Sequence, residues 1–204
     1  GMTHKDFLQS SMACSDIVCE QNMDIGEKIL ECVKSSMDVV GCNTNLGIIL
    51  LCVPIVEALY MDKNHIFNQS NLKKVISNIN EDQTKKIYKA INVANAGGMG
   101  SKDEFDLNNN KSKGFTILEA MNFASSYDYI AEEYSNNFNN IINTISVNWR
   151  KYFKQMGSGE NATTATFLNL ISSNPDSLIA RKYGLDKAKA VSEGFKAISN
   201  QYCA

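Results

Sequence analysis

Apolar residues recur along most of the sequence at intervals of three and four positions. This spacing places them on one face of an α-helix, whereas a half-buried strand would alternate with a period of two. The period is clear in four sets: Ile25, Ile29, Val33, Met37 and Val40; Leu72, Val75, Ile76 and Ile79; Tyr134, Phe138, Ile141, Ile145, Trp149 and Tyr152; and Val191, Phe195, Ile198 and Tyr202. The pattern predicts an all-α fold, a single-domain bundle of about nine or ten helices over residues 1–204.

The longest apolar run extends from Leu46 to Val56 and is followed directly by Glu57. At about eleven residues it is much shorter than the roughly 20 that a bilayer requires, so no membrane-spanning helix is expected. The run predicts a central helix buried on all sides, with Thr44 as its N-cap and a kink at Pro54.

Polar residues mark where several helices should begin and end. Four pairs carry this information: Asp24 with Glu27, Thr116 with Glu119, Asn174 with Pro175, and Gly184 with Asp186. The first two pairs have the spacing of capping boxes. The third predicts an N-cap followed by proline at the first position of a short helix, and the fourth predicts where that helix ends and the last one begins.

One region lacks helical spacing. Residues 95–115 contain three glycines and then three carboxylates, namely Gly97, Gly98, Gly100, Asp103, Glu104 and Asp106. A loop of about 20 residues is long for a compact helical domain, and such loops are usually functional or disordered. Glycines let the backbone approach a ligand closely, and clustered carboxylates suit a hard cation such as Mg²⁺. A solvated acidic loop explains the same residues equally well.

Composition narrows the range of functions. The 20 Lys and Arg residues nearly balance the 22 Asp and Glu residues. The sequence contains no block of like charge, which argues against nucleic acid or an anionic membrane as the partner. The six cysteines include no Cys-x-x-Cys pair, so we expect free thiols in a reducing cytoplasm rather than a zinc site. No signal peptide is apparent, and Gly1 ahead of Met2 is interpreted as an expression scar.

A polar cluster, Asn43, Thr44 and Asn45 with Gly47, lies at the start of the apolar helix. Backbone N–H groups and the positive end of the helix dipole favour an anion such as phosphate there. Simple capping and turn formation explain the same residues without a ligand.

Two more segments could carry chemistry. A predicted acidic helix from Glu119 to Glu133 would place Asp128 and Glu132 on one face. The segment from Asp176 to Lys182 ends on Arg181 and Lys182, which suit a triphosphate. Both segments also have an explanation that needs no function. The acids could simply be exposed to solvent, and the two cations could interact with the negative end of the short helix.

Together these segments resemble the triphosphoribosyl-dephospho-CoA synthase family in its short form. The matching stretches run from Asn43 to Pro54, Gly97 to Asp106, Thr116 to Met121, Asp128 to Phe138, and Asp176 to Gly184. Two departures stand out. Asn45 and Leu46 replace a His and a Lys of the better-known synthases, and the sequence opens at Thr3 without the family's leading Lys-Pro-Gly-Asn-Val segment.

The resemblance implies an all-helical transferase that uses ATP and 3′-dephospho-CoA. The 2′-hydroxyl of the dephospho-CoA ribose displaces adenine from C1′ of ATP, which yields a prosthetic-group precursor for acyl carrier proteins. Nucleic acid and membranes are not expected as partners, and a homodimer is left open. Two alternatives remain: a relative of the same fold that acts on another coenzyme precursor, and a non-catalytic helical protein that binds a nucleotide.

The resemblance also assigns roles to residues. Asp103, Asp106 and Asp128 are expected to serve metal binding and hydroxyl activation, with Mg²⁺ held by Asp103, Glu104 and Asp106. The nucleotide is expected to contact Asn43, Thr44, Asn45, Gly47, Gly97, Gly98, Gly100, Asp176, Arg181 and Lys182.

Overall fold

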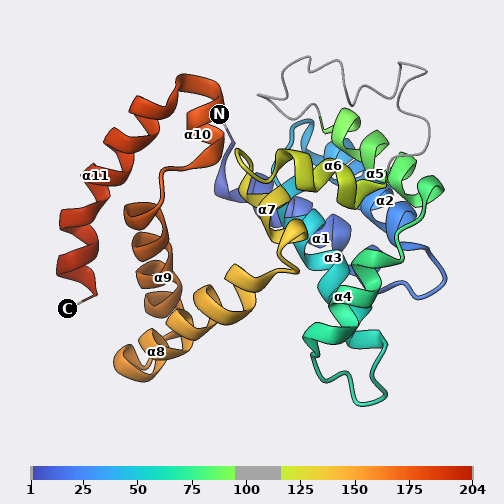
Figure 1. Cartoon of the computed structure of the whole chain (residues 1–204), viewed down its shortest axis with the longest axis horizontal. Coiled ribbons are helices and arrows are strands. Elements are labelled where there is room, and N and C mark those ends of the chain that lie inside the picture. The colour runs from blue at the N-terminus through green and yellow to red at the C-terminus, as the bar shows by residue number, and fades with distance from the viewer. Residues whose placement is uncertain (1, 95–115, 204) are drawn as a thin grey trace. The chain divides into compact units, whose positions relative to one another are not determined.

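The computed structural model describes residues 2–94 and 116–203, which contain α-helices and no strands (Figure 1). The predicted all-α fold is confirmed, although the described residues form eleven α-helices rather than nine or ten. The chain divides into two compact units, unit 1 from Gly1 to Phe123 and unit 2 from Ala124 to Ala204. The prediction of a single domain stays a prediction, and the predicted loop over residues 95–115 lies outside the described residues.

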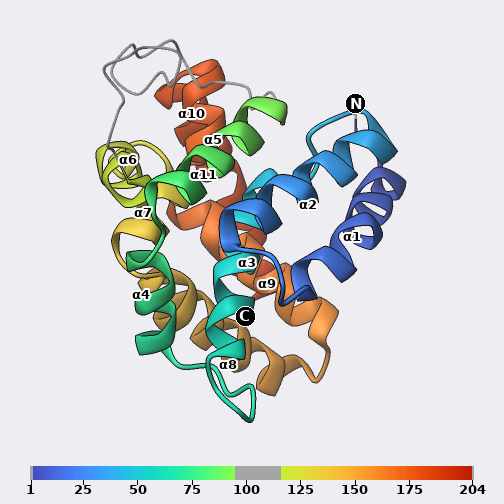
Figure 2. The same cartoon turned by 90° about the vertical axis from the view of Figure 1, so that its right-hand side faces the viewer.

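Helices near the N-terminus build the described part of unit 1. They are α1 (His4–Cys19), α2 (Ile25–Val40), α3 (Leu46–Tyr60), α4 (Gln69–Ser77), α5 (Glu81–Val93) and α6 (Ile117–Ala124). Helix α2 lies between α1 and α5 and packs against both (Figure 2). The periodic apolar face that the sequence predicted for α2 is the buried one, since Ile25, Ile29 and Val33 all belong to the core.

The contact between α2 and α5 depends on a glycine. A Cβ atom at Gly26 would lie 2.5 Å from the carbonyl oxygen of Gln83, at the start of α5. Backbone atoms cannot move aside as a flexible side chain can. Gly26 therefore sets how closely these two helices approach.

Helix α3 is less buried than its composition suggested. Val53 and Pro54 are fully buried, but Ile48 is 56% exposed and Cys52 is also exposed, so the expectation of burial on all sides is wrong. The N-cap prediction is also wrong, because the cap residue is Asn45 rather than Thr44. The capping hydrogen bond comes from Asn43, whose side-chain oxygen accepts from the backbone N–H of Leu46 at 3.1 Å.

One cation is buried inside unit 1. Lys28 of α2 is 0% exposed and forms an ion pair with Glu57 of α3, whose side chain remains 26% exposed. The Lys28 ammonium also lies 5.9 Å from the centre of the Tyr60 ring. A buried charge is tolerated when it is paired, so this ion pair ties α2 to α3.

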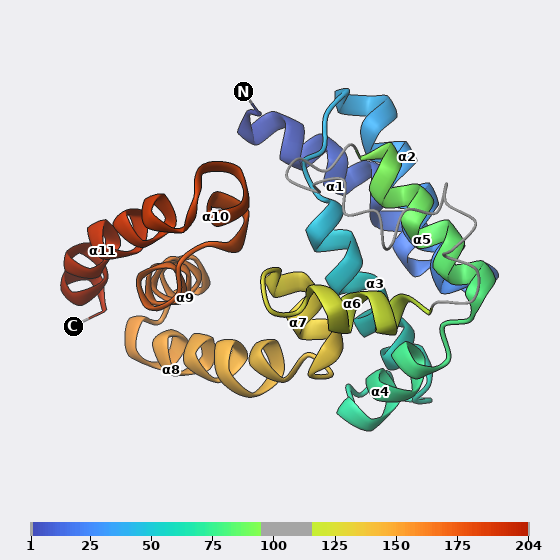
Figure 3. The ribbon, with the colours of Figure 1, turned by 45° about the horizontal axis from the view of Figure 1, so that its top comes forward.

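The remaining helices belong to unit 2. They are α7 (Tyr129–Ser135), the π-helical turn η2 (Ile141–Ile145), α8 (Ser146–Met156), α9 (Gly159–Ser173), α10 (Ser177–Tyr183) and α11 (Leu185–Tyr202). Helix α9 packs against both α8 and α11 (Figure 3). The core between α8 and α9 contains Tyr152, Ala162 and Ala165, with Trp149 packed beside them.

The apolar stripe from Tyr134 to Tyr152 does not form one continuous helix. Helix α7 ends at Ser135, and the backbone then takes positive φ angles of 58° at Asn137 and 59° at Phe138. Phe138 is nevertheless fully buried, as is Tyr134. The helical period alone does not encode this break in the backbone between α7 and the residues that follow it.

Predicted helix boundaries were confirmed where the capping interaction is local. Thr116 and Glu119 form both bonds of a capping box, and Asp24 caps α2 through the backbone N–H of Glu27, although the reciprocal bond is absent. The prediction for Asn174 was wrong. This residue ends α9, and Asp176 caps α10 instead.

The predicted boundary between the last two helices was nearly correct. Gly184 follows α10 with a φ of 92°, as its sequence position indicated, and α11 then begins at Leu185 rather than Asp186. The predicted acidic helix from Glu119 to Glu133 is divided into α6 and α7.

The six cysteines are free thiols, as expected, although Cys19 and Cys52 are exposed rather than packed in the core. Within the described ranges, no helix has the length and apolar character needed to cross a membrane.

Candidate functional site

The predicted phosphate-binding residues at the start of α3 are held by hydrogen bonds to the rest of unit 1. The Thr44 hydroxyl lies 2.5 Å from the Ser10 hydroxyl. Ser10 donates its own proton to the carbonyl of Asp6 at 2.7 Å, so Thr44 donates to Ser10. Thr44 thereby attaches the segment ahead of α3 to α1, and Gly47 lies in the first turn of α3.

Asn45 points into the protein. Its side chain is buried, and its amide nitrogen donates to Ser36 at 3.0 Å and to the Cys14 sulfur at 3.5 Å. Ser36 in turn donates to the carbonyl of Cys32 at 2.9 Å. The hydrogen bond with Cys14, together with burial, raises the pKa of the Cys32 thiol. This network uses the Asn45 amide nitrogen to join α1, α2 and α3.

The predicted metal-binding carboxylates cannot be placed. Asp103, Glu104 and Asp106 lie outside the described residues, as do Gly97, Gly98 and Gly100. Across residues 2–94 and 116–203, no group of three or more His, Cys, Asp or Glu side chains could hold a metal ion.

Two predicted site residues meet in unit 2. The carboxylate of Asp128, the N-cap of α7, forms an ion pair with the guanidinium of Arg181 on α10. The other Asp128 oxygen accepts from the backbone N–H groups of Ile130 at 2.8 Å and Ala131 at 3.1 Å. Sequence analysis assigned these two residues separate roles, and the structure joins them across a separation of 53 positions.

The Asp128–Arg181 pair is partly open to solvent. The side chains are 18% exposed for Asp128 and 23% exposed for Arg181. The Arg181 Nε is buried, and it has no hydrogen-bond partner within the part of the chain that the structure describes. The exposed part of the guanidinium is what an anionic ligand could contact.

Asp176 and Lys182, the other predicted site residues of this segment, have different surroundings. Asp176 caps α10, since its carboxylate accepts from the backbone N–H of Ile179 at 2.8 Å. Lys182 is exposed, and its ammonium forms no ion pair with any described residue. Asp176 therefore shapes the helix that presents the cations, and Lys182 remains available to an anion.

The neighbouring acids of α7 have structural partners. Glu132 accepts from the Asn140 side chain at 3.3 Å, and Glu133 accepts from the backbone N–H of Ile141 at 3.2 Å. Burial raises the pKa of Glu133. Sequence analysis assigned Glu133 no role, because its partner Ile141 lies beyond the break after α7, which periodicity does not reveal.

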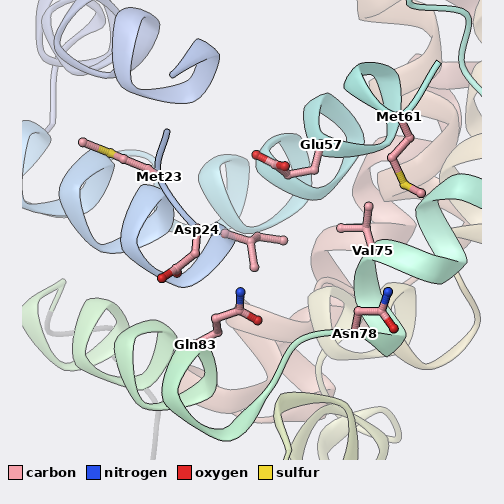
Figure 4. Close-up of a pocket in the computed structure, with 8 residues that line it drawn as sticks. Met23, Asp24, Glu57, Met61, Val75, Asn78 and Gln83 are labelled. Atoms are coloured by element: carbon pink, nitrogen blue, oxygen red, sulfur yellow. The ribbon is translucent and has the colours of Figure 1, made fainter. Parts of the chain in front are cut away.

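Unit 1 contains a cavity of about 270 Å³ whose described lining includes none of the predicted site residues (Figure 4). Its walls come from the start of α2, the end of α3, the end of α4 and the start of α5. Glu57, Asn78 and Gln83 contribute polar groups, and Met61 and Val75 contribute apolar surface. The only sequence signal for this cavity was the position of Glu57 directly after the apolar run.

Comparison with known proteins gives three results. The sequence matches the family model described as CitG, ATP:dephospho-CoA triphosphoribosyl transferase, over residues 1–204. A search of curated proteins found no match. The fold is similar to the crystal structure of an Archaeoglobus fulgidus protein assigned as a triphosphoribosyl-dephospho-CoA synthase, with a TM-score of 0.67 and 19% identity, covering 98% of this chain and 85% of that one.

Proposed function

The chain belongs to the ATP:dephospho-CoA triphosphoribosyl transferase family, and on this premise we propose that it transfers the triphosphoribosyl group of ATP to 3′-dephospho-CoA with release of adenine. The match to the family over residues 1–204 carries the proposal.

The proposed reaction exchanges one bond at the anomeric carbon of ATP. A bond forms between C1′ and the 2′-oxygen of the dephospho-CoA ribose, and the bond between C1′ and N9 of adenine breaks. Substitution at such a carbon passes through an oxocarbenium-like state, as in glycoside hydrolysis. The hydroxyl proton is taken by a carboxylate, and the departing adenine nitrogen gains a proton, so the proton count is conserved.

Asp103, Asp106 and Asp128 are the carboxylates proposed for hydroxyl activation. Asp128 is the one whose surroundings are described. Its Oδ1 accepts two backbone N–H groups, and its Oδ2 accepts from Arg181. A carboxylate oxygen has two lone pairs, so Oδ2 retains one with which to accept the hydroxyl proton. The caps and the ion pair would hold this oxygen in a fixed position.

Contacts to the nucleotide are proposed for the remaining residues. Arg181 and Lys182 would bind the triphosphate, Arg181 through the exposed part of its guanidinium and Lys182 as an exposed point charge. The other proposed contacts are Asn43, Thr44, Asn45, Gly47, Gly97, Gly98, Gly100 and Asp176. At Thr44 and Asn45 the backbone is the better candidate, because the Thr44 hydroxyl donates to Ser10 and the Asn45 amide nitrogen is directed inward.

Mg²⁺ is proposed to accompany the triphosphate and to neutralise part of its charge. Asp103, Glu104 and Asp106 are the residues proposed to hold it, because carboxylate oxygens are the ligands that Mg²⁺ prefers. A cytoplasmic location and a homodimer stay predictions.

The experiment that tests the proposal is a chromatographic assay for free adenine after incubation with Mg·ATP and dephospho-CoA. Adenine should appear only when both substrates are present, and Asp106→Asn and Asp128→Asn should each slow its release by about 100-fold or more. Asp82→Asn, an exposed residue in the first turn of α5, is the matched control and should release adenine at the wild-type rate. Wild-type rates in both test variants would refute the assignments.

A further inference from the structure

The cavity in unit 1 has the features of a binding site for a small planar molecule. Its lining residues come from the ends of four helices, α2, α3, α4 and α5. Its volume of about 270 Å³ is just below the range of typical ligand pockets, which begin at about 300 Å³. The space therefore suits a ring system rather than a whole coenzyme.

The charges around the cavity are already balanced. Both oxygens of Asp24 are engaged, one by the backbone N–H of Glu27 at 2.9 Å and the other by Lys86. Glu57 forms its ion pair with Lys28 through Oε1. A strongly charged ligand would upset this balance, so the cavity favours a neutral group.

Specific hydrogen-bonding atoms remain unused. Among the described residues, no partner is present for the second carboxylate oxygen of Glu57 or for the side-chain amide of Asn78. The Gln83 oxygen accepts from the backbone N–H of Asn80 at 3.0 Å, which leaves its amide nitrogen free to donate. In Figure 4 that nitrogen points away from α5 toward the middle of the lining residues, which include the apolar Ile25.

We infer that this cavity binds an adenine base. Its exocyclic amine would donate to the free oxygen of Glu57, and a ring nitrogen would accept from Gln83. The Asn78 amide can pair with an adenine edge, because an amide and adenine present matching donors and acceptors. Met23 and Met61 supply thioethers, which pack well against aromatic rings.

The inference rests on the proposed function only for the source of the base, since ATP and dephospho-CoA each carry an adenine. Glu57 is ten residues beyond Gly47 on α3, or about 15 Å along the helix axis. The lining of the cavity therefore does not include the predicted phosphate-binding residues at the start of that helix.

The test compares adenosine with purine riboside, which lacks the exocyclic amine, by calorimetric titration of the full chain. Adenosine should bind about tenfold more tightly or better, because a site built for a donor rejects the analogue without it. Gln83→Glu keeps the oxygen that caps α5 but removes the donor, and should weaken adenosine binding by about tenfold or more. Gln155→Glu, the same change on the exposed face of α8, is the control and should leave binding unchanged.

A second variant distinguishes a loss of binding from a loss of folding. Asn78→Ser removes an exposed amide and should also weaken adenosine binding, while the thermal unfolding midpoint stays at the wild-type value. Equal binding of adenosine and purine riboside, or adenosine affinities in both variants equal to the wild type, would overturn the inference.

Competition by ATP and by dephospho-CoA distinguishes the two sources of the base, because the substrate whose adenine occupies the cavity displaces adenosine. The inference and the proposed function can fail independently. If adenine is released but adenosine binding does not depend on Gln83, only the inferred cavity site is refuted. If adenosine binding depends on Gln83 but no adenine is released, only the proposed reaction is refuted.

Discussion

Among the ion pairs that connect distant parts of the sequence, the Lys28–Glu57 pair of unit 1 and the Asp128–Arg181 pair of unit 2 differ in burial. In unit 1, Lys28 is sealed from solvent beneath Glu57. In unit 2, both Asp128 and Arg181 remain partly exposed. The buried Lys28 ammonium is available only to its partner, whereas the guanidinium of Arg181, whose side chain is 23% exposed, can also meet a ligand. The comparison assigns Lys28 and its bond to Oε1 of Glu57 to stability, leaves the second Glu57 oxygen to the cavity, and assigns the Asp128–Arg181 pair to the proposed chemistry.

The largest expected effect follows from Glu57→Gln. This change leaves the charge of Lys28 buried without a counter-ion, which should lower the free energy of unfolding by about 3 kcal/mol. Urea denaturation followed by circular dichroism measures it. Adding Lys28→Met to this variant should restore part of the loss, because the uncompensated charge is then gone.

The matched control is Glu81→Gln, which removes a carboxylate from an exposed pair with Lys85. Its urea midpoint should equal that of the wild type within error. If Glu57→Gln were equally harmless, the structural role of the buried pair would be excluded.

Arg181→Gln should have a smaller effect on stability and a larger one on function. The partly exposed pair should contribute about 1 kcal/mol, measured as the coupling between Arg181→Gln and Asp128→Asn in a double-mutant cycle. The loss in the rate of adenine release, expressed as a free energy, should exceed the loss in the free energy of unfolding, and the KM for ATP should rise. A loss of stability as large as that of Glu57→Gln, with normal kinetics, would reverse the comparison.

Glu133 gives a dependence on pH. Burial raises its pKa in the folded protein above the unfolded value, so the folded state binds the proton more tightly. The resulting contribution is fully present below the unfolded pKa and is lost as pH rises through the folded pKa. Stability measured upward from pH 4 should therefore decline less steeply in Glu133→Gln than in the wild type. Parallel profiles would contradict this role.

The smallest expected effect on the fold is that of Lys182→Gln. This exposed ammonium has no ion-pair partner in the described residues, so the unfolding midpoint should not change. The KM for ATP should nevertheless rise by about tenfold or less, the loss expected of one solvent-exposed charge on a phosphate. A normal KM would remove Lys182 from the proposed triphosphate contacts.

Local signals in the sequence predicted local structure well. The capping box at Thr116 and Glu119 and the turn at Gly184 involve residues within a few positions of one another, and both were confirmed. The signal at Asn174 and Pro175 misled because Asp176, two positions on, caps the same helix more directly. Competing caps of equal propensity are resolved only by packing.

Interactions between distant residues could not be predicted. The partners of Asn45 are Cys14 and Ser36, on two other helices, and nothing in the sequence near Asn45 indicates them. The same holds for Asp128 and Arg181, which were both selected as site residues but never as partners. Family resemblance identified these positions as important, and only the fold shows what each side chain contacts.

The central claim is that the ribose of ATP leaves its base and joins dephospho-CoA. Incubation with Mg²⁺ and ATP labelled with ¹³C in the ribose alone, followed by mass spectrometry, tests it most directly. The account predicts unlabelled free adenine and an equal amount of a dephospho-CoA adduct that carries the labelled triphosphoribosyl group. Labelled ADP or AMP as the sole nucleotide product, with no adenine released, would contradict it.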